Sequence, residues 1–259
     1  PSSGIQCSSA PVNCHWLRLL REMRKRLLLL RHGQALHNPR AEARRAAGCS
    51  FDEFLHTMKE DDALDADLTP LGRQQAAAAC NSVDGGAASL GIELIVASSL
   101  SRAIETAALA FPEAAAAGRD RFISLDCLCE RSGWLLNAKR RPRDELVSRF
   151  PAVGFDLLTE TDECWTEELE EEAACAQRGY EALLWVARRP ESTIAVVAHG
   201  GIFHYLLSQH SKVSADAPTA ARFGNAELRA CTLCWKDEAA GTLRLEADES
   251  VQPSAMSGV

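Results

Sequence analysis

The sequence predicts an α/β fold built on a largely parallel sheet, and three observations support it. Short apolar runs lie near residues 25–30, 93–97, 122–127 and 193–198, which is typical of strands covered on both faces. Helical patterns occupy the segments between them, as parallel connections require. Beyond the last run, Glu227–Trp235 and Thr242–Ala247 flank Ala239-Ala240-Gly241 and predict a terminal antiparallel hairpin.

The composition limits the class of protein. With 259 residues, 46% of them hydrophobic, the chain can bury a large core as one domain. The formal net charge of −8 argues against a nucleic-acid partner and against binding to a membrane surface. No apolar run approaches the ~20 residues that a membrane span needs. The oligomeric state is left open.

Ten cysteines are scattered along the chain, and no Asn-x-Ser/Thr sequon occurs. This usage predicts mostly reduced thiols in a cytoplasmic protein. Cys231 and Cys234 lie three apart in a predicted strand and point to opposite faces, which suits neither a zinc site nor a redox pair. Cys127 and Cys129 would share a strand face, so core filling and a disulfide or redox role are both open.

The two ends are predicted to be tails. Residues 1–23 are rich in Ser and Cys and carry no acidic residue before Glu22. They are interpreted as a tail leading into a short helix or as the remnant of an organelle-targeting peptide, which would change the compartment. Residues 24–248 are predicted to form the domain, and residues 249–259 a C-terminal tail.

The first predicted strand ends on Arg31, His32 and Gly33. In open α/β sheets, ligands bind beyond the carboxyl ends of strands. Arginine offers a planar, permanently charged fork for a phosphate. Histidine offers a nitrogen nucleophile near neutral pH, and glycine allows a ligand to approach the backbone.

Two helices are expected after this loop. Asn38-Pro39 marks a turn, and Arg40–Ala47 is predicted to be a short basic helix. A second helix near residues 51–60 would place four apolar side chains on one face: Phe51, Phe54, Leu55 and Met58. This pair of helices forms either the lid or wall of a pocket or simply packed surface.

The next helix and strand lead to a second arginine. Thr69 as N-cap and Pro70 at the first position predict a helix start, with the helix ending by residues 84–86. After the strand Glu93–Ala97, a further helix places Arg102 in its first turn with Thr106 on the same face. A helix N-terminus with an arginine suits a phosphate, and a surface ion pair is the alternative.

The third strand, Phe122–Cys127, is followed by Glu130. Further on, the basic run Lys139, Arg140, Arg141 and Arg143 either helps to bind an anion or lies in a solvated loop. Residues 142–150 are predicted to be a short helix. The segment Glu160–Glu172 carries eight acidic side chains and is predicted to begin a solvated helix that continues through residue 186.

The fourth strand, Thr193–Ala198, ends on His199-Gly200-Gly201 and repeats the pattern of the first. Two histidines at strand ends, an arginine in a first helical turn and a glutamate after a strand therefore point to one pocket at the carboxyl edge of the sheet.

These residues, in this order, resemble the histidine phosphatase superfamily, the phosphoglycerate-mutase-like proteins. The resemblance extends from residue 26 to about 235 and is carried by five motifs: Arg31-His32-Gly33-Gln34 with Asn38, Leu68-Thr69-Pro70-Leu71-Gly72 with Gln75-Ala76, Ser99-Leu100-Ser101-Arg102 with Thr106-Ala107, Glu130, and Val197-Ala198-His199-Gly200-Gly201.

The resemblance implies a three-layer α/β/α sandwich with a largely parallel central sheet and an antiparallel edge. It implies His32 as a nucleophile that forms a phosphohistidine, and Arg31, Arg102 and His199 as a phosphate clamp. Glu130 would protonate the leaving oxygen and then activate water. A backbone carbonyl that accepts the second N–H of the His32 ring would keep this nucleophile neutral.

No metal or cofactor is implied, because two arginines and a second histidine neutralise the phosphate. The residues expected to bind substrate beside this clamp are Asn38, Gly33, Gln34 and Gly200.

One departure favours a phosphatase. Cofactor-dependent phosphoglycerate mutases carry Glu-Arg-His-Tyr-Gly at the acid position, whereas this chain has Glu130-Arg131-Ser132-Gly133-Trp134. The stretch Glu130–Phe150 resembles a phosphoglycerate-mutase-like branch found in fungi and plants. A mutase that retains the phosphoryl group and a non-catalytic phosphate-binding module remain the alternatives.

The expected substrate is a small phosphorylated metabolite, such as a sugar phosphate or a phosphorylated acid. Cations near the phosphate loops would hold its second anionic group. The candidates are His37, Arg40, Arg44, Arg45 and the run Lys139–Arg143.

Overall fold

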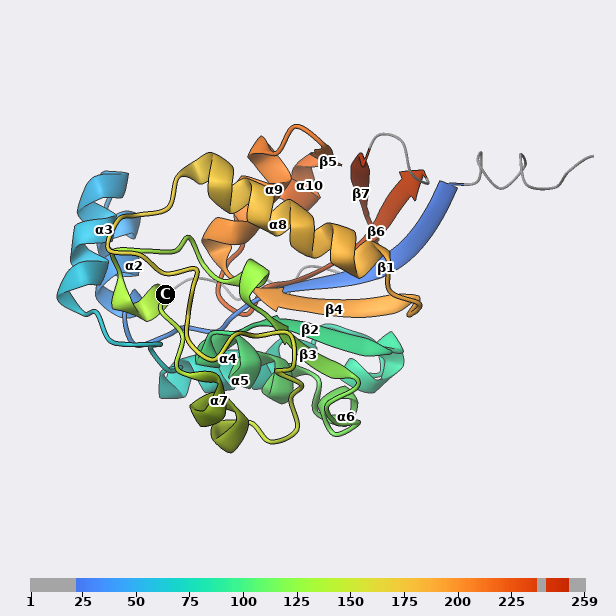
Figure 1. Ribbon diagram of the computed structural model, residues 1–259. Coiled ribbons are helices and arrows are strands. Elements are labelled where there is room, and N and C mark those ends of the chain that lie inside the picture. The colour runs from blue at the N-terminus through green and yellow to red at the C-terminus, as the bar shows by residue number, and fades with distance from the viewer. Residues whose placement is uncertain (1–21, 237–240, 252–259) are drawn as a thin grey trace, which may run out of the picture.

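The computed structural model describes residues 22–236 and 241–251, and within these ranges seven strands form one sheet (Figure 1). Its order is β3-β2-β4-β1-β6-β7-β5. The four strands from β3 to β1 run parallel, β6 is antiparallel to both β1 and β7, and β5 pairs in parallel with β7. The bounds are β1 Glu22–Arg31, β2 Leu94–Ser98, β3 Phe122–Leu125, β4 Thr193–Ala198, β5 Val213–Ala215, β6 Leu228–Lys236 and β7 Leu243–Ala247.

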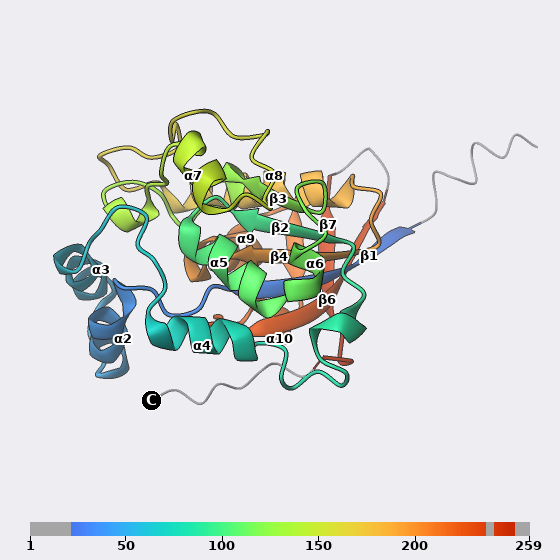
Figure 2. The ribbon, with the colours of Figure 1, turned by 90° about the horizontal axis from the view of Figure 1, so that it is seen from below.

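Helices cover both faces of the sheet, which confirms the three-layer α/β fold. Helices α8 and α9 lie on one face, and α4, α5 and α6 lie on the other (Figures 1 and 2). The bounds are α2 Asn38–Ala46, α3 Phe51–Glu60, α4 Pro70–Ala78, α5 Ser101–Ala110, α6 Pro112–Ala115, α7 Arg143–Arg149, α8 Glu172–Ala187, α9 Gly200–Gln209 and α10 Ala217–Ala220. Short 3-10 turns occur at Ala87–Leu90, Asp126–Leu128 and Leu136–Ala138.

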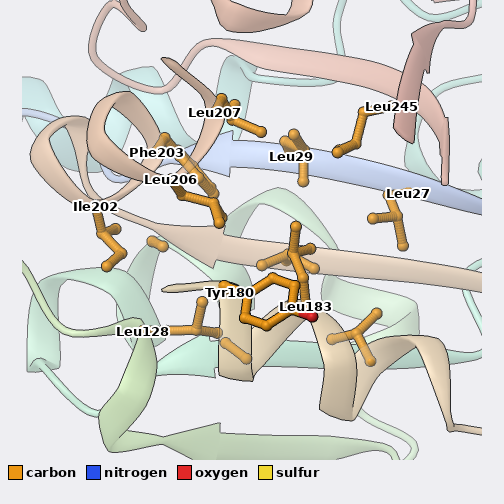
Figure 3. Packing of buried hydrophobic residues seen from close by; sticks show 14 of the residues in the cluster. Leu27, Leu29, Leu128, Tyr180, Leu183, Ile202, Phe203, Leu206, Leu207 and Leu245 are labelled. Carbon is orange, nitrogen blue, oxygen red and sulfur yellow. The ribbon is translucent and has the colours of Figure 1, made fainter. Parts of the chain in front are cut away.

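The four-leucine run of β1 belongs to both layers of the core. Leu27 and Leu29 pack with the side chains of α8 and α9, including Leu183 and Phe203 (Figure 3). Leu28 and Leu30 join the opposite cluster, which includes residues of α5. Alternate residues of a strand point to opposite faces, so an uninterrupted apolar run is what a strand in the middle layer requires.

The predicted start of the second motif helix is confirmed. The hydroxyl of Thr69 accepts a hydrogen bond from the backbone N–H of Gly72 at 2.9 Å, and Pro70 occupies the first turn of α4. The helix ends at Ala78, earlier than the predicted end near residues 84–86.

Two element predictions were wrong. Strand β3 ends at Leu125, and Cys127 lies in the 3-10 turn that follows, so Cys127 and Cys129 do not share a strand face. The acidic segment 160–171 forms loops, and α8 begins only at Glu172. One of its carboxylates forms an ion pair with another element: Glu160 pairs with Arg143 of α7.

The packed region extends beyond the predicted domain boundaries. Strand β1 begins at Glu22, which lies opposite Lys236 of β6. At the other end, Val251 is buried in the same cluster as Leu28 and Leu30. The short edge strand β5 has no counterpart among the predicted elements. Of the predicted N-terminal tail, residues 1–23, Glu22 and Met23 belong to β1, and residues 1–21 lie outside the described ranges.

None of the helices in the described ranges combines the length and the apolar character needed to span a bilayer.

Candidate active site

The carboxyl ends of β1 and β4 lie side by side and bring the two predicted histidines together. Arg31 is paired with Ala198 in the parallel register, and the backbone N–H of His32 donates to the carbonyl of Ala198 at 3.0 Å. The ring centroids of His32 and His199 are 4.9 Å apart. One phosphate group can therefore contact both rings.

The ring of His32 is held with one nitrogen satisfied and the other directed into the site. Its Nδ1 lies 2.6 Å from the carbonyl oxygen of Gly33, which can only accept. Nδ1 therefore carries the proton, and Nε2 keeps its lone pair. The ring is 2% exposed. Burial, followed by the charges of Arg102 and Arg31, holds the pKa of His32 well below its usual value.

Arg102 lies in the first turn of α5 and is fully buried. Its Nε is 3.4 Å from Nε2 of His32, and its Nη1 donates to the carbonyl of Asn137 at 2.6 Å. The next turn of α5 holds the loop that carries His32, because the hydroxyl oxygen of Thr106 accepts the backbone N–H of Gly33 at 3.1 Å. The alternative for Arg102, a surface ion pair, was wrong: the side chain is buried, and no ion pair joins it to an acidic side chain in the described ranges.

Four buried nitrogens around this point have no hydrogen-bond partner among the described residues: Arg31 Nε, Arg102 Nη2, His199 Nδ1 and His37 Nδ1. Unpartnered buried polar groups are rare in folded proteins, and four nitrogens gathered at one point call for an explanation such as a bound ligand. Two of them belong to guanidinium groups, which suit the oxygens of a phosphate. This donor set matches a tetrahedral oxyanion.

Glu130 follows the turn after β3 and reaches the N-terminus of α9. Its carboxylate accepts the backbone N–H groups of Gly201 at 3.1 Å and Ile202 at 3.2 Å. A Cβ at Gly201 would lie 2.2 Å from Oε1 of Glu130, so only glycine lets the carboxylate approach this closely. The helix start thus fixes the position of Glu130.

A cavity of about 270 Å³ opens at this edge of the sheet. His32, Arg31 and Glu130 line it, while Arg102 and His199 lie fully buried beside His32. The structure therefore brings all five predicted catalytic residues to one place. Helices α2 and α3 stand at this end of the sheet (Figure 1), and the predicted wall of the pocket is confirmed by Phe51, Phe54, Leu55 and Met58.

Two of the four residues expected to bind substrate line the cavity. Asn38 and Gly200 line the cavity, whereas Gly33 and Gln34 are not among its described lining residues. The side chain of Gln34 is engaged elsewhere, because its oxygen accepts the hydroxyl of Thr69 at 3.0 Å. At Gly33 a Cβ would lie 2.3 Å from the carbonyl oxygen of Gly72. Gly33 thus allows the two motif segments to touch rather than a ligand to approach.

The basic run after Glu130 does not line the cavity. Arg140 is buried, bonds to both carboxylate oxygens of Asp126, and donates to the carbonyls of Thr159 and Thr161. Lys139 lies over the ring of Trp165. Both hypotheses for this run, anion binding and a solvated loop, were wrong for Arg140, because its charge serves to order the loops around it.

Several lining residues escaped sequence reasoning, among them Arg131, Tyr205, Arg222 and Phe223. Tyr205 had a signal, since it follows Gly201 by four residues on α9 and faces the same way. Arg222 and Phe223 had none, because they enter from the loop before β6. In the described ranges no group of three His, Cys, Asp or Glu side chains is placed to hold a metal ion.

Comparisons with known proteins find relatives in a plant. A phosphoglycerate mutase-like protein of Arabidopsis thaliana is 30% identical over 241 residues, covering 81% of this chain and 84% of the relative. Phosphoglycerate mutase-like protein 1 of the same plant is 29% identical over 238 residues, covering 81% of each.

Solved structures share the fold. Mycobacterial hydrolase 2 matches with a TM-score of 0.52 and 23% identity, covering 90% of this chain and 94% of that one. Mycobacterial hydrolase 1 matches with a TM-score of 0.50 and 22% identity, covering 89% and 100%.

The family model of the histidine phosphatase superfamily (branch 1) matches residues 27–245, which include both strand-end histidines and the sheet that carries them. The resemblance inferred from the motifs is confirmed, and the chain belongs to this superfamily.

Proposed function

We propose that this protein is a phosphatase that hydrolyses a phosphomonoester of a small metabolite through a phosphohistidine on His32. One observation carries the proposal: Nδ1 of His32 lies 2.6 Å from the carbonyl oxygen of Gly33, while Nε2 lies 3.4 Å from Arg102 Nε, near buried nitrogens without partners. Phosphoryl transfer passes through a loose transition state, so positioning and charge stabilisation supply most of the catalysis.

In the first step, Arg31, Arg102 and His199 hold the three non-bridging oxygens of the phosphate. Nε2 of His32 attacks phosphorus, the bond to the ester oxygen breaks, and Glu130 gives its proton to the departing alcohol. In the second step, the Glu130 carboxylate takes a proton from water as the oxygen of that water attacks phosphorus. The bond to His32 breaks, and inorganic phosphate leaves.

The electrostatics of the site support this sequence of events. The neutral His32 of the resting enzyme needs no deprotonation before attack. After attack its ring is a cation bonded to an anionic phosphoryl group, and the carbonyl of Gly33 still accepts the Nδ1 proton.

Two further parts of the proposal are the location of the protein and the size of its substrate. We propose a cytoplasmic location because eight cysteines in the described ranges are free thiols. The substrate is proposed to be small because α2 and α3 wall one side of the cavity.

The experiment is turnover of p-nitrophenyl phosphate in EDTA, with His32→Ala as the inactive comparison. Phosphate release by the wild-type protein, with an alkali-stable phosphoenzyme trapped on His32, is the expected result. Interconversion of 2- and 3-phosphoglycerate without net phosphate release would instead identify a mutase. Phosphate binding without turnover would identify a binding module.

A further inference from the structure

Three arginines outside the phosphate clamp line the cavity; Arg131 pairs with Glu172 at 3.5 Å, and the other two are Arg45 and Arg222. Arg45 comes from the last turn of α2, and Arg222 comes from the loop between α10 and β6. Both belong to the same cavity as His32. Neither forms an ion pair with an acidic side chain in the described part of the chain, so both keep a full positive charge for a ligand.

Arg45 and Arg222 line the same cavity as Arg31 of the proposed clamp. The pKa of Arg45 is lowered by burial first, and then by the neighbouring charges of Arg222 and Arg31. The acidic groups of the cavity are already engaged: Glu42 accepts from Arg31 at 3.4 Å and from Asn225 at 2.9 Å. Without an anion, these like charges repel each other across the cavity.

The arginine on α2 rests on an aromatic surface. The guanidinium of Arg45 is 4.9 Å from the ring centroid of Phe54 and 6.0 Å from that of Phe51. Stacking of this kind leaves the N–H edge of the guanidinium free to donate. Leu55 and Met58 continue the apolar wall along the same helix. The cavity thus joins the phosphate clamp to a second cationic region across apolar side chains.

We propose that Arg45 and Arg222 form a second anion subsite, so that the substrate is a phosphomonoester with a second anionic group on a short carbon chain. The inference rests on the proposed phosphatase function and names the substrate class for the same site. A carboxylate and a second phosphate share the required chemistry, because both accept charge-assisted hydrogen bonds from guanidinium groups.

The test compares three ligands that differ at one end: glycerol 3-phosphate, 3-phosphoglycerate and glycerol 1,3-bisphosphate. The wild-type enzyme should prefer one or both of the doubly anionic esters over glycerol 3-phosphate in kcat/KM. The preferred ester distinguishes a carboxylate subsite from a phosphate subsite. Higher salt should reduce the preference, because the subsite is open to solvent.

The variants Arg45→Gln and Arg222→Gln should each lower that preference by about tenfold, the usual scale for a hydrogen bond to a charged group. The loss should appear mainly in KM, since the subsite binds substrate and transition state alike. Arg44→Gln is the matched control, because Arg44 lies next to Arg45 on α2, is exposed and does not line the cavity. This control should leave the preference unchanged.

Calorimetric binding of the three ligands to His32→Ala tests the second anion subsite independently of phosphatase activity. A variant that combines Arg45→Gln with Arg222→Gln completes the test. If the wild-type enzyme hydrolyses p-nitrophenyl phosphate but this double variant still prefers the doubly anionic esters, the subsite is wrong and the phosphatase stands. If no ester is hydrolysed, the phosphatase is wrong, and the subsite is judged by binding alone. Equal Kd values for all three ligands would then overturn it.

Discussion

Arg102 and His32 meet through their facing nitrogens, with 3.4 Å between Nε of the arginine and Nε2 of the histidine. At this length the contact is a weak hydrogen bond. A phosphate oxygen that accepts from the guanidinium would replace it and leave the lone pair of Nε2 directed at phosphorus. The same contact keeps a positive charge beside the ring, which opposes its protonation.

Arg102→Lys should lower kcat/KM for p-nitrophenyl phosphate by about 10²- to 10³-fold, the scale seen when one preorganised donor is removed from an anionic transition state. Lysine keeps the charge but cannot present both Nε and the unpartnered Nη2. Arg73→Lys on the exposed pair with Glu105 is the control. A loss no larger than that of the control would exclude Arg102 from the clamp.

Stability should fall as the pH drops below about 6.5. Burial lowers the pKa values of His32, His37 and His199 first, and the charge of Arg102 lowers all three further. Below the ordinary histidine pKa the unfolded chain therefore binds more protons than the folded one, so stability is gained with rising pH and lost with falling pH. Asp65, whose pKa burial raises to about 6, acts in the opposite direction below that value.

The contribution of one histidine can be isolated with His37→Gln. Between pH 6.5 and 5, urea unfolding of this variant should show a slope of stability against pH that is smaller by up to about 1.4 kcal/mol per pH unit. Above pH 7.5 the slopes of the two proteins should coincide. Coincident slopes at pH 5 to 6 as well would show that His37 is protonated in the folded protein.

Glu130→Gln should slow hydrolysis of alkyl phosphates much more than that of p-nitrophenyl phosphate. An alkoxide leaving group needs a proton, and a nitrophenolate hardly does. Gly201→Ala should reproduce this pattern, because a Cβ there would displace the carboxylate. Gly224→Ala is the control, since its nearest contact would be an ordinary 3.4 Å. Equal losses on both substrate types would show that Glu130 is not the acid.

Ser98 is expected to orient the second histidine. Its Oγ lies 2.7 Å from Nε2 of His199 and accepts the backbone N–H of Leu100 at 3.2 Å. A hydroxyl that donates to Nε2 leaves the ring proton on Nδ1, where a phosphate oxygen accepts it. The other acceptor near this hydroxyl is Sγ of Cys129 at 3.7 Å, and a thiol sulfur is a weak acceptor.

Ser98→Ala should therefore lower kcat by about tenfold and change the pH profile, since either nitrogen of His199 could then carry the proton. Ser124→Ala is the matched control on β3, because its hydroxyl is buried and has no partner among the described residues. A similar kcat and pH profile for both variants would exclude the orienting role.

The sequence predicts the local part of the site well. His32 and His199 each follow an apolar run directly, and parallel strands place their carboxyl ends together, so adjacency follows from local pattern and fold class. The cavity wall formed by α3 could also be predicted from the sequence, because helical spacing determines which side chains share a face.

Long-range partners decide the rest. The sequence around Arg140 does not indicate that its guanidinium will be buried and hydrogen-bonded to Asp126, Thr159 and Thr161. Likewise, the acidic segment 160–171 has a composition that favours a helix, yet it forms loops. In these loops Glu160 pairs with Arg143, and Glu170 pairs with Arg178. Ion pairs between separate segments therefore override local propensity here. Arg222 was missed because it reaches the cavity from the loop before β6, without a local pattern to mark it.

The position of β1 determines when the site can form during synthesis. Strand β1, which His32 follows, hydrogen-bonds to β4 on one side and to β6 on the other, and both partners come much later in the sequence, at residues 193–198 and 228–236. Pairings this distant in sequence form slowly and late. A chain still emerging from the ribosome therefore carries His32 without its neighbouring strands, and His32 and His199 are brought together only after β4 and β6 have been synthesised.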